Sequence, residues 1–321
     1  MSVRWAGRML AAVVAMALLA GLAGCAPEKP AWAQHPLRIA GGGVTGVYYD
    51  YGAHLASALR RDLHVDAEVV QTNGSVDNLR LIGEGKAQLG FAQSDAVADA
   101  VAGTGDFETP LPIRAAARLY DEYVHVVVRA DSGIRSISEL SGHTVSLGGA
   151  GSGVSVVARR VLAASDVAVG AVHDAALGLD AAIAALTDHR IDAFFWVGGL
   201  PTPGIQKLAS RLPIRLLSIG ADVVERADAA HAGVYRSAEF PVGAYGSVEP
   251  TVAMTVPNYL VTSADVPDSL VRDVLAELFD TRAEVARSIP AAALLDRRLA
   301  IFTDPIPLHP GAAEYYRDSR Q

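Results

Sequence analysis

The stretch "LRIAGGGVTGVYYDYG", residues 37–52, decides the fold class. It has the pattern of a short apolar strand, a glycine-rich turn and the first turns of a helix. Gly41, Gly43 and Gly46 match the G-x-G-x-x-G spacing that binds the pyrophosphate of a dinucleotide. The stretch therefore predicts a β-turn-α unit whose glycine loop approaches a ligand, and the next question is whether that ligand is a nucleotide.

The second predicted strand, residues 66–72, argues against a nucleotide. A dinucleotide-binding unit places an acidic residue at the tip of this strand, where it binds the ribose hydroxyls. Here the acidic side chains, Asp66 and Glu68, lie at the start of the strand and inside it. Tyr48 and Tyr49 are also bulky where the helix should approach a phosphate. The unpaired N–H groups and the dipole of a helix start favour other anions as well.

The rest of the chain alternates short apolar strands with helical stretches, which is typical of an α/β fold. The order of elements predicts two lobes with a ligand cleft between them. The chain builds one lobe, crosses over at residues 123–130, builds a second lobe and crosses back near residues 251–260. Two crossings predict a two-strand hinge. The predicted boundaries are residues 37–124 plus 255–321 for lobe 1 and 125–254 for lobe 2.

The N-terminus has the pattern of a bacterial lipoprotein. Arg4 and Arg8 precede an uncharged apolar run, which predicts a lipoprotein signal peptide over residues 1–24. The run is shorter than the roughly 20 apolar residues that span a bilayer. Leu22-Ala23-Gly24-Cys25 matches a lipobox, and Cys25 is the only cysteine. We expect a lipid anchor at Cys25 on the outer face of the cell membrane, a plain secretory signal being the alternative, and a tether over residues 25–36.

Composition excludes several classes of function. The formal net charge is −8, and loss of Arg4 and Arg8 with the signal peptide leaves −10. No basic block remains, so we expect no nucleic-acid partner. The chain has neither a G-x-S-x-G elbow nor an H-E-x-x-H pair, and its nine histidines are scattered. The sequence therefore predicts no enzyme activity, no cofactor and no metal.

Three glycine-rich segments have the pattern of helix starts that follow strands: Thr45-Gly46, Gly74-Ser75 and residues 149–153. The third lies in the predicted lobe 2. If helix N-termini from both lobes converge, they can bind carboxylates with few or no arginines. Taken singly, each segment is better explained as an ordinary βα turn.

Longer motifs resemble a known family, the TAXI family. The chain carries "GGGVTGVYYDYG", "QTNGSVDNLRLIGEGKAQLGFAQSD", "HVVVRADSGIRSISELSG", "GAGSGVSVVARRVL" and "RIDAFFWVGGLPTPGIQKLA", and "VPNYLVTSADVP" and "PLHPGAAEYY" extend the likeness towards the C-terminus. The family comprises extracytoplasmic solute-binding subunits of TRAP-type transporters. The resemblance implies a two-lobed periplasmic-binding-protein fold, type II-like, that closes on a small carboxylate or amino acid such as glutamate or 2-oxoglutarate. It also implies delivery to an integral-membrane TRAP permease.

The resemblance, carried over position by position, implies ligand contacts from glycines and polar side chains at strand ends. The predicted ligand-binding residues are Thr45, Gly46, Tyr48, Tyr49, Asn73, Gly74, Ser75, Gln93 and Ser94 in lobe 1, and Gly151, Ser152, Gly153 and Trp196 in lobe 2. Packing for Tyr48, helix capping for Ser75 and a buried strand position for Trp196 are the alternatives. Asp95 is a candidate partner for a ligand amino group. A sensor lipoprotein of the same fold and an exported hydrolase are the alternative functions.

Overall fold

A computed structural model describes residues 29–231, 233–248 and 250–319. The predicted signal peptide, residues 1–24, and the lipidation site Cys25 lie outside the described residues. Among the described helices, none combines the length and the apolar character needed to cross a bilayer. Trp32, in the segment predicted as a tether, donates from Nε1 to Asp273, 2.7 Å away. The end of that segment therefore contacts the folded chain.

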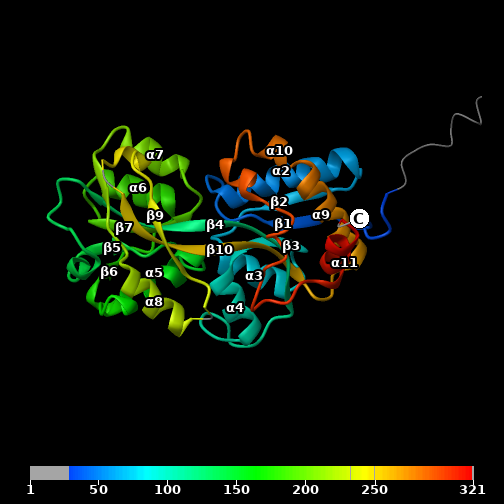
Figure 1. Ribbon diagram of the computed structural model, residues 1–321, viewed down its shortest axis with the longest axis horizontal. Helices are drawn as coiled ribbons and strands as arrows, with labels where there is room; N and C mark the ends of the chain where they lie inside the picture. The colour runs from blue at the N-terminus through cyan, green and yellow to red at the C-terminus, as the bar shows by residue number, and fades with distance from the viewer. Residues whose placement is uncertain (1–28, 232, 249, 320–321) are drawn as a thin grey trace, which may run out of the picture.

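The described chain forms a two-lobed α/β structure, which confirms the predicted fold class (Figure 1). One mixed sheet runs through both lobes in the order β2-β1-β3-β10-β4-β7-β5-β6, with β8 on β4 and β9 on β10. Its strands are β1 Leu37–Ala40, β2 Ala67–Val70, β3 Leu89–Gln93, β4 Ile113–Arg129, β5 Thr144–Ser146, β6 His173–Asp174, β7 Ala193–Gly198, β8 Ile214–Leu216, β9 Arg236–Phe240 and β10 Thr251–Ser263.

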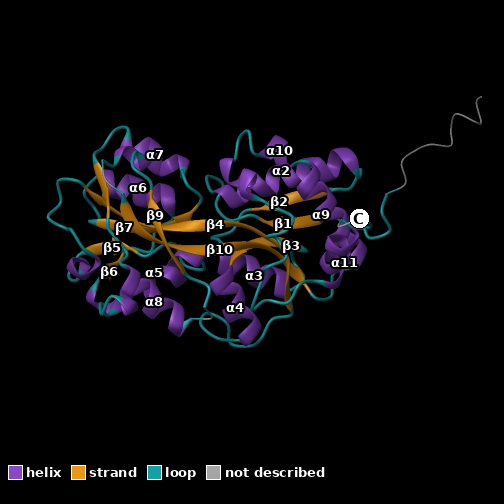
Figure 2. Cartoon of the chain, in the orientation of Figure 1, coloured by secondary structure: helices purple, strands orange, loops and turns teal. Residues whose placement is uncertain are grey.

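Helices cover both faces of the sheet in each lobe (Figure 2). Lobe 1 carries α2 Val47–Asp62, α3 Ser75–Gly83, α4 Ser94–Ala102, α9 Asp268–Asp280, α10 Arg282–Val285 and α11 Pro310–Asp318. Lobe 2 carries α5 Gly153–Ala164, α6 Leu179–Thr187, α7 Pro203–Ala209 and α8 Ala221–Ala230. Four 3-10 turns complete the described elements: η1 Ile137–Leu140, η2 Val169–Ala171, η3 Ala244–Gly246 and η4 Pro290–Leu294.

Amphipathic spacing explains why α2 packs on the sheet. Tyr51, Leu55 and Leu59 recur at intervals of four and are almost fully buried, in one cluster with Phe91 of β3. Gly52 faces the sheet so closely that a Cβ there would approach Phe91 and Val69 to 3.3 Å. The helix start at the glycine loop is therefore held rigidly against β1, β2 and β3.

Strands β4 and β10 connect the lobes. They pair antiparallel from Val124 opposite Met254 to Ile113 opposite Ser263. The predicted crossing segments fall within these strands, but β4 begins ten residues earlier than the predicted crossing at residue 123. Charged side chains within β4 concealed its start from a search for apolar runs. The exact lobe boundaries, residues 37–124 plus 255–321 and 125–254, stay a prediction.

The C-terminal segment differs from expectation. The spacing of apolar residues in the sequence predicts one long helix over residues 266–288, but α9 ends at Asp280 and α10 begins at Arg282. The prolines near the C-terminus suggest a segment that wraps over the surface, yet Pro310 opens helix α11, which packs on α9. Proline fits the first helical position because an N–H group at that position would have no partner within the helix. His309 Nδ1 accepts from the N–H of Gly311 and so supports this start.

Candidate functional site

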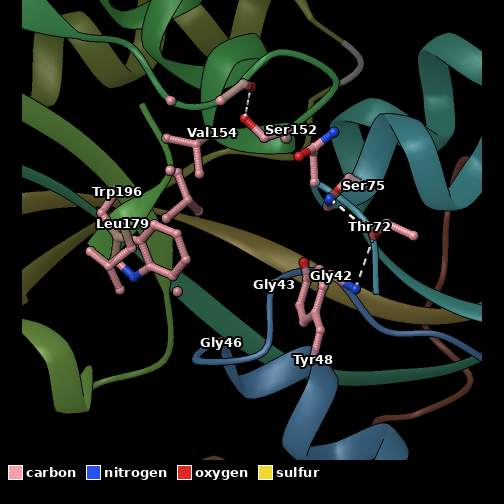
Figure 3. Close-up of a pocket in the computed structure, with 18 of the residues that line it drawn as sticks. Gly42, Gly43, Gly46, Tyr48, Thr72, Ser75, Ser152, Val154, Leu179 and Trp196 are labelled. Atoms are coloured by element: carbon pink, nitrogen blue, oxygen red, sulfur yellow. Dashed lines mark hydrogen bonds between the residues drawn. The ribbon is translucent and has the colours of Figure 1, made fainter. Parts of the chain in front are cut away.

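A cavity of about 460 Å³ lies between the lobes (Figure 3). Lobe 1 contributes residues 42–48 after β1, residues 71–75 after β2, Gln93 at the end of β3 and Glu122 of β4. Lobe 2 contributes residues from the turns after β5 and β6 and from the end of β7. These lobe 2 residues are Gly148, Gly149, Ala150, Ser152, Gly153, Val154, Ala176, Leu177, Gly178, Leu179, Asp180, Ala181, Trp196, Val197 and Gly198.

Four helices begin at the cavity wall: α2, α3, α5 and α6. Ser152 caps α5, because its Oγ accepts from the N–H of Ser155 at 3.2 Å. The residues that precede the other three helices are Gly46, Gly74 and Gly178, and none provides a side-chain cap. No side chain therefore occupies the first-turn N–H groups of these helices, although that of Asp77 in α3 donates to the Gly151 carbonyl. Sequence reasoning identified three of these helix starts and missed α6.

Most of the predicted ligand-binding residues lie at this cavity. Its lining includes Thr45, Gly46, Tyr48, Asn73, Gly74, Ser75, Gln93, Ser152, Gly153 and Trp196. Their contact with a ligand stays a prediction. Tyr49, Ser94 and Gly151 lie outside the lining. Tyr49 packs beside Gly41, Ser94 is fully buried, and the Gly151 carbonyl accepts from the N–H of Asp77 at 3.1 Å.

Two alternatives considered from sequence are resolved by the local geometry. Ser75 is not the N-cap of α3, because that position belongs to Gly74 at φ 126°, which only glycine readily adopts. Ser75 Oγ instead accepts from the N–H of Gln93 at 3.2 Å. Trp196 is half-buried at the cavity, and its Nε1 donates to Thr202 Oγ1 at 3.1 Å. Its ring is therefore fixed in orientation at the wall.

Glu122 is a cavity residue that sequence reasoning missed. It lies on β4 and is 2% exposed. Its Oε2 accepts from Tyr48 OH at 3.0 Å and from Gln93 Nε2 at 3.1 Å. Burial raises the pKa of the Glu122 carboxyl to about 8, against the opposing effect of these two hydrogen bonds. The signal in the sequence was an acidic residue in the strand pattern "LYDEYVHVVV".

The cavity has carboxyl groups but no cationic side chain among its described lining residues. Among its described lining residues are two carboxyl groups, Glu122 and Asp180, and no lysine, arginine or histidine. Asp180 lies at the start of α6 and its Oδ2 accepts from Thr45 Oγ1 at 2.7 Å, a bond between the lobes. Favourable interactions with an anion must therefore come from the helix starts and from neutral donors.

The lobes touch closely beside the cavity. A Cβ at Gly153 would collide with Gln93 Oε1 and Ser75 Oγ, so the start of α5 needs a residue without a side chain. Next to it, Gly74 and Ser152 face each other across the same contact. The described structure is therefore closed on the side of α3 and α5.

Asp95 does not face the cavity, contrary to expectation. Its carboxylate is fully buried and accepts from Arg160 Nη1 of α5 at 3.0 Å and from Tyr235 OH at 2.6 Å. Arg160 also pairs with Asp99 of α4. Asp95 therefore joins the lobes instead of binding a ligand.

Other titratable groups show no arrangement for a metal. Within the part of the chain that the structure describes, no cluster of three or more His, Cys, Asp or Glu side chains is placed to hold one. His125 is buried in β4, with Nε2 3.0 Å from Tyr245 OH and Nδ1 2.9 Å from the Tyr123 carbonyl. Burial lowers the pKa of His125 to about 4. It is a satisfied core histidine.

Solved structures share this fold at low sequence identity. PhnD1 from Prochlorococcus marinus, in complex with methylphosphonate, matches with 12% identity and a TM-score of 0.53 over 89% of this chain and 96% of that one. The alkanesulfonate-binding protein SsuA from Xanthomonas axonopodis, bound to MOPS, matches with 16% identity and a TM-score of 0.51 over 90% and 84%. A putative L-cystine ABC transporter protein from Listeria monocytogenes matches with 11% identity and a TM-score of 0.51 over 82% and 98%.

These likenesses establish the two-lobed fold of solute-binding proteins and nothing about the ligand. Family membership comes from the sequence itself. Residues 39–319, almost the whole described chain, match one family, and the protein accordingly belongs to the NMT1-like family.

Proposed function

We propose that the protein is an extracytoplasmic solute-binding protein that binds a small carboxylate, such as glutamate or 2-oxoglutarate, between its lobes. The observation that carries this proposal is the convergence of four helix starts, two from each lobe, on one cavity. Each helix start carries a partial positive charge and first-turn N–H donors, of which those of Asp77 and Ser155 already have partners in Gly151 and Ser152. A carboxylate is a small anion that can accept such donors without a cationic side chain.

The size of the cavity supports a small ligand. About 460 Å³ falls within the range of roughly 300–1,000 Å³ that is common for small-molecule sites. Residues of both lobes line it, so a bound ligand would stabilise the closed arrangement over an open one. A receptor that closes in this way releases its ligand unchanged, which distinguishes it from an enzyme.

The proposed partner is an integral-membrane permease of the TRAP class. The TAXI-like motifs support this partner. The fold supports it less directly, since proteins of ABC transporters share the same fold. The proposed location is the outer face of the bacterial cell membrane, with the lipid anchor at Cys25. A sensor lipoprotein, which would present the ligand to a signalling partner, is the alternative.

Native mass spectrometry of the mature protein, before and after mild unfolding and refolding, tests the proposal. We expect a retained small carboxylate that is lost on unfolding. A thermal-shift panel of amino acids, dicarboxylates and 2-oxoacids then identifies the compound that restores the melting temperature. Chemical conversion of any panel compound would favour the hydrolase alternative, and absence of any shift would overturn the carboxylate receptor.

A further inference from the structure

Hydrogen-bond acceptors of lobe 1 concentrate at one wall of the cavity. Gln93 turns its Nε2 towards Glu122 Oε2, so its own Oε1 faces the lobe contact, buried and without a hydrogen-bond partner among the described residues. Tyr48 OH donates to the same Oε2. Both donors thus reach a single oxygen of Glu122, which leaves the other oxygen available. A buried acceptor without a donor is unfavourable.

Among the described residues, no cationic side chain pairs with Glu122 or lines the cavity beside it. The carboxyl group interacts with the neutral donors Gln93, Tyr48 and Tyr120, and the negative charge of Asp95 adds to its raised pKa. Burial therefore keeps Glu122 protonated in the empty cavity at neutral pH. The groups that act on Glu122 are Tyr48 of α2, Gln93 of β3, Asp95 of α4 and Tyr120 of β4. Ser75 of α3 and Asn258 of β10 in turn interact with Tyr48 and Tyr120.

We propose that Glu122 binds a protonated amino group of the ligand, so that the cleft selects a zwitterion over the carboxylate that lacks the amine. This inference rests on the solute-binding function proposed above. It specifies that the ligand carries an amino group in addition to its carboxylate. An ammonium has only donors, which match the oxygen of Glu122 that Tyr48 and Gln93 leave without a hydrogen bond. The carboxylate of the same ligand lies at the helix starts, on the donor side of the cavity.

Binding of the ammonium then releases a proton. An opposite charge within about 4–6 Å favours the ionised form of a carboxyl group, so the Glu122 pKa falls when the ammonium arrives. The O–H bond of the carboxyl breaks, its proton passes to bulk water, and the carboxylate pairs with the ammonium. A ligand without an amine gives no such release, because the carboxyl stays neutral.

Isothermal titration calorimetry of the mature protein measures this proton directly. The probes are matched pairs that differ by the amine: L-glutamate and glutarate, L-aspartate and succinate, L-leucine and 4-methylpentanoate. Titrations at pH 6.5 in two buffers of different ionisation enthalpy give the proton count. We expect the bound amino acid to release about one proton and to bind at least tenfold more tightly than its amine-free counterpart.

The variant Glu122→Gln separates this role from a structural one, since it keeps the shape of the side chain. We expect this variant to abolish proton release and to weaken binding of the amino acid about tenfold or more. The affinity for the amine-free counterpart should change less than about threefold. Amine-free compounds that bind as tightly as their amino-acid counterparts, or amino acids that bind without proton release, would overturn this inference alone. Failure of every probe to bind would overturn the proposed function as well.

Discussion

Arg160 of α5 donates to the buried carboxylate of Asp95 at the start of α4, at 3.0 Å, and this ion pair joins lobe 2 to lobe 1. The Asp95 side chain is 0% exposed and that of Arg160 10%. Helix α5 therefore has two roles, since its first residue, Gly153, lines the cavity while Arg160, two turns later, holds the lobes together. Contact with a ligand and contact between the lobes are coupled through one rigid element.

Removal of Arg160 is expected to be strongly destabilising. Arg160→Leu leaves Asp95 buried without its cation, and we expect a loss of about 3 kcal/mol in the free energy of unfolding. The neighbouring Arg159 pairs with Asp106 at the surface. Arg159→Leu should therefore change the free energy of unfolding by less than about 1 kcal/mol. Urea denaturation of both variants checks the contrast. Equal losses in the free energy of unfolding would mean that the buried ion pair contributes no more to stability than the exposed one.

The stability of the protein should fall as the pH rises, because of Glu122. Its pKa is about 8 in the folded protein and near 4.5 when unfolded, so the folded state holds more protons between these values. The free energy of unfolding therefore decreases from about pH 4.5 and levels off above about pH 8. Glu122→Gln removes this contribution. We expect a flatter profile from chemical denaturation at pH 5.5, 7 and 8.5, and parallel profiles would contradict the raised pKa.

A side chain at Gly153 should hold the lobes apart. Its Cβ would collide with Gln93 and Ser75, so Gly153→Leu is expected to weaken ligand binding about 100-fold and to increase the radius of gyration in solution X-ray scattering. Gly170→Ala is the control, because a Cβ there meets no atom within 4 Å. An unchanged affinity in Gly153→Leu would place the ligand away from the start of α5.

Trp196 should report ligand binding by fluorescence. Its ring lies at the cavity, whereas the other described tryptophan, Trp32, packs near Asp273 on lobe 1. We expect the emission of the wild type and of Trp32→Phe to change on titration with ligand, and that of Trp196→Phe to stay constant. A response that follows Trp32 instead would show that the ligand acts at a distance from the cavity.

The parts of the site that could be predicted are those encoded locally. The strand-glycine-helix pattern around Gly46 and Gly74 fixes both a backbone conformation and a free helix start within a few residues. Such short signals depend little on distant partners. The same reasoning located Gln93 at a strand end, since the polar ends of neighbouring parallel strands meet at one edge of a sheet.

Glu122 and Asp95 could not be placed in this way. Each is a charged residue that is buried because of partners far along the chain, Tyr48 and Gln93 for the first and Arg160 and Tyr235 for the second. A single sequence does not show which distant residues meet. For the same reason the first half of β4, with its four charged side chains, lacked the apolar run expected of a buried strand.

The place of β10 in the sheet also determines the order in which the protein can be assembled. It lies between β3 and β4 in lobe 1, although lobe 2 separates it from both in the chain. A ribosome therefore finishes the strands of lobe 2 from β5 to β9 before it makes the strand that completes lobe 1. Until then β3 keeps an open edge, which is prone to pair with other chains. Lobe 1 therefore completes its sheet only after the whole of lobe 2 has been synthesised.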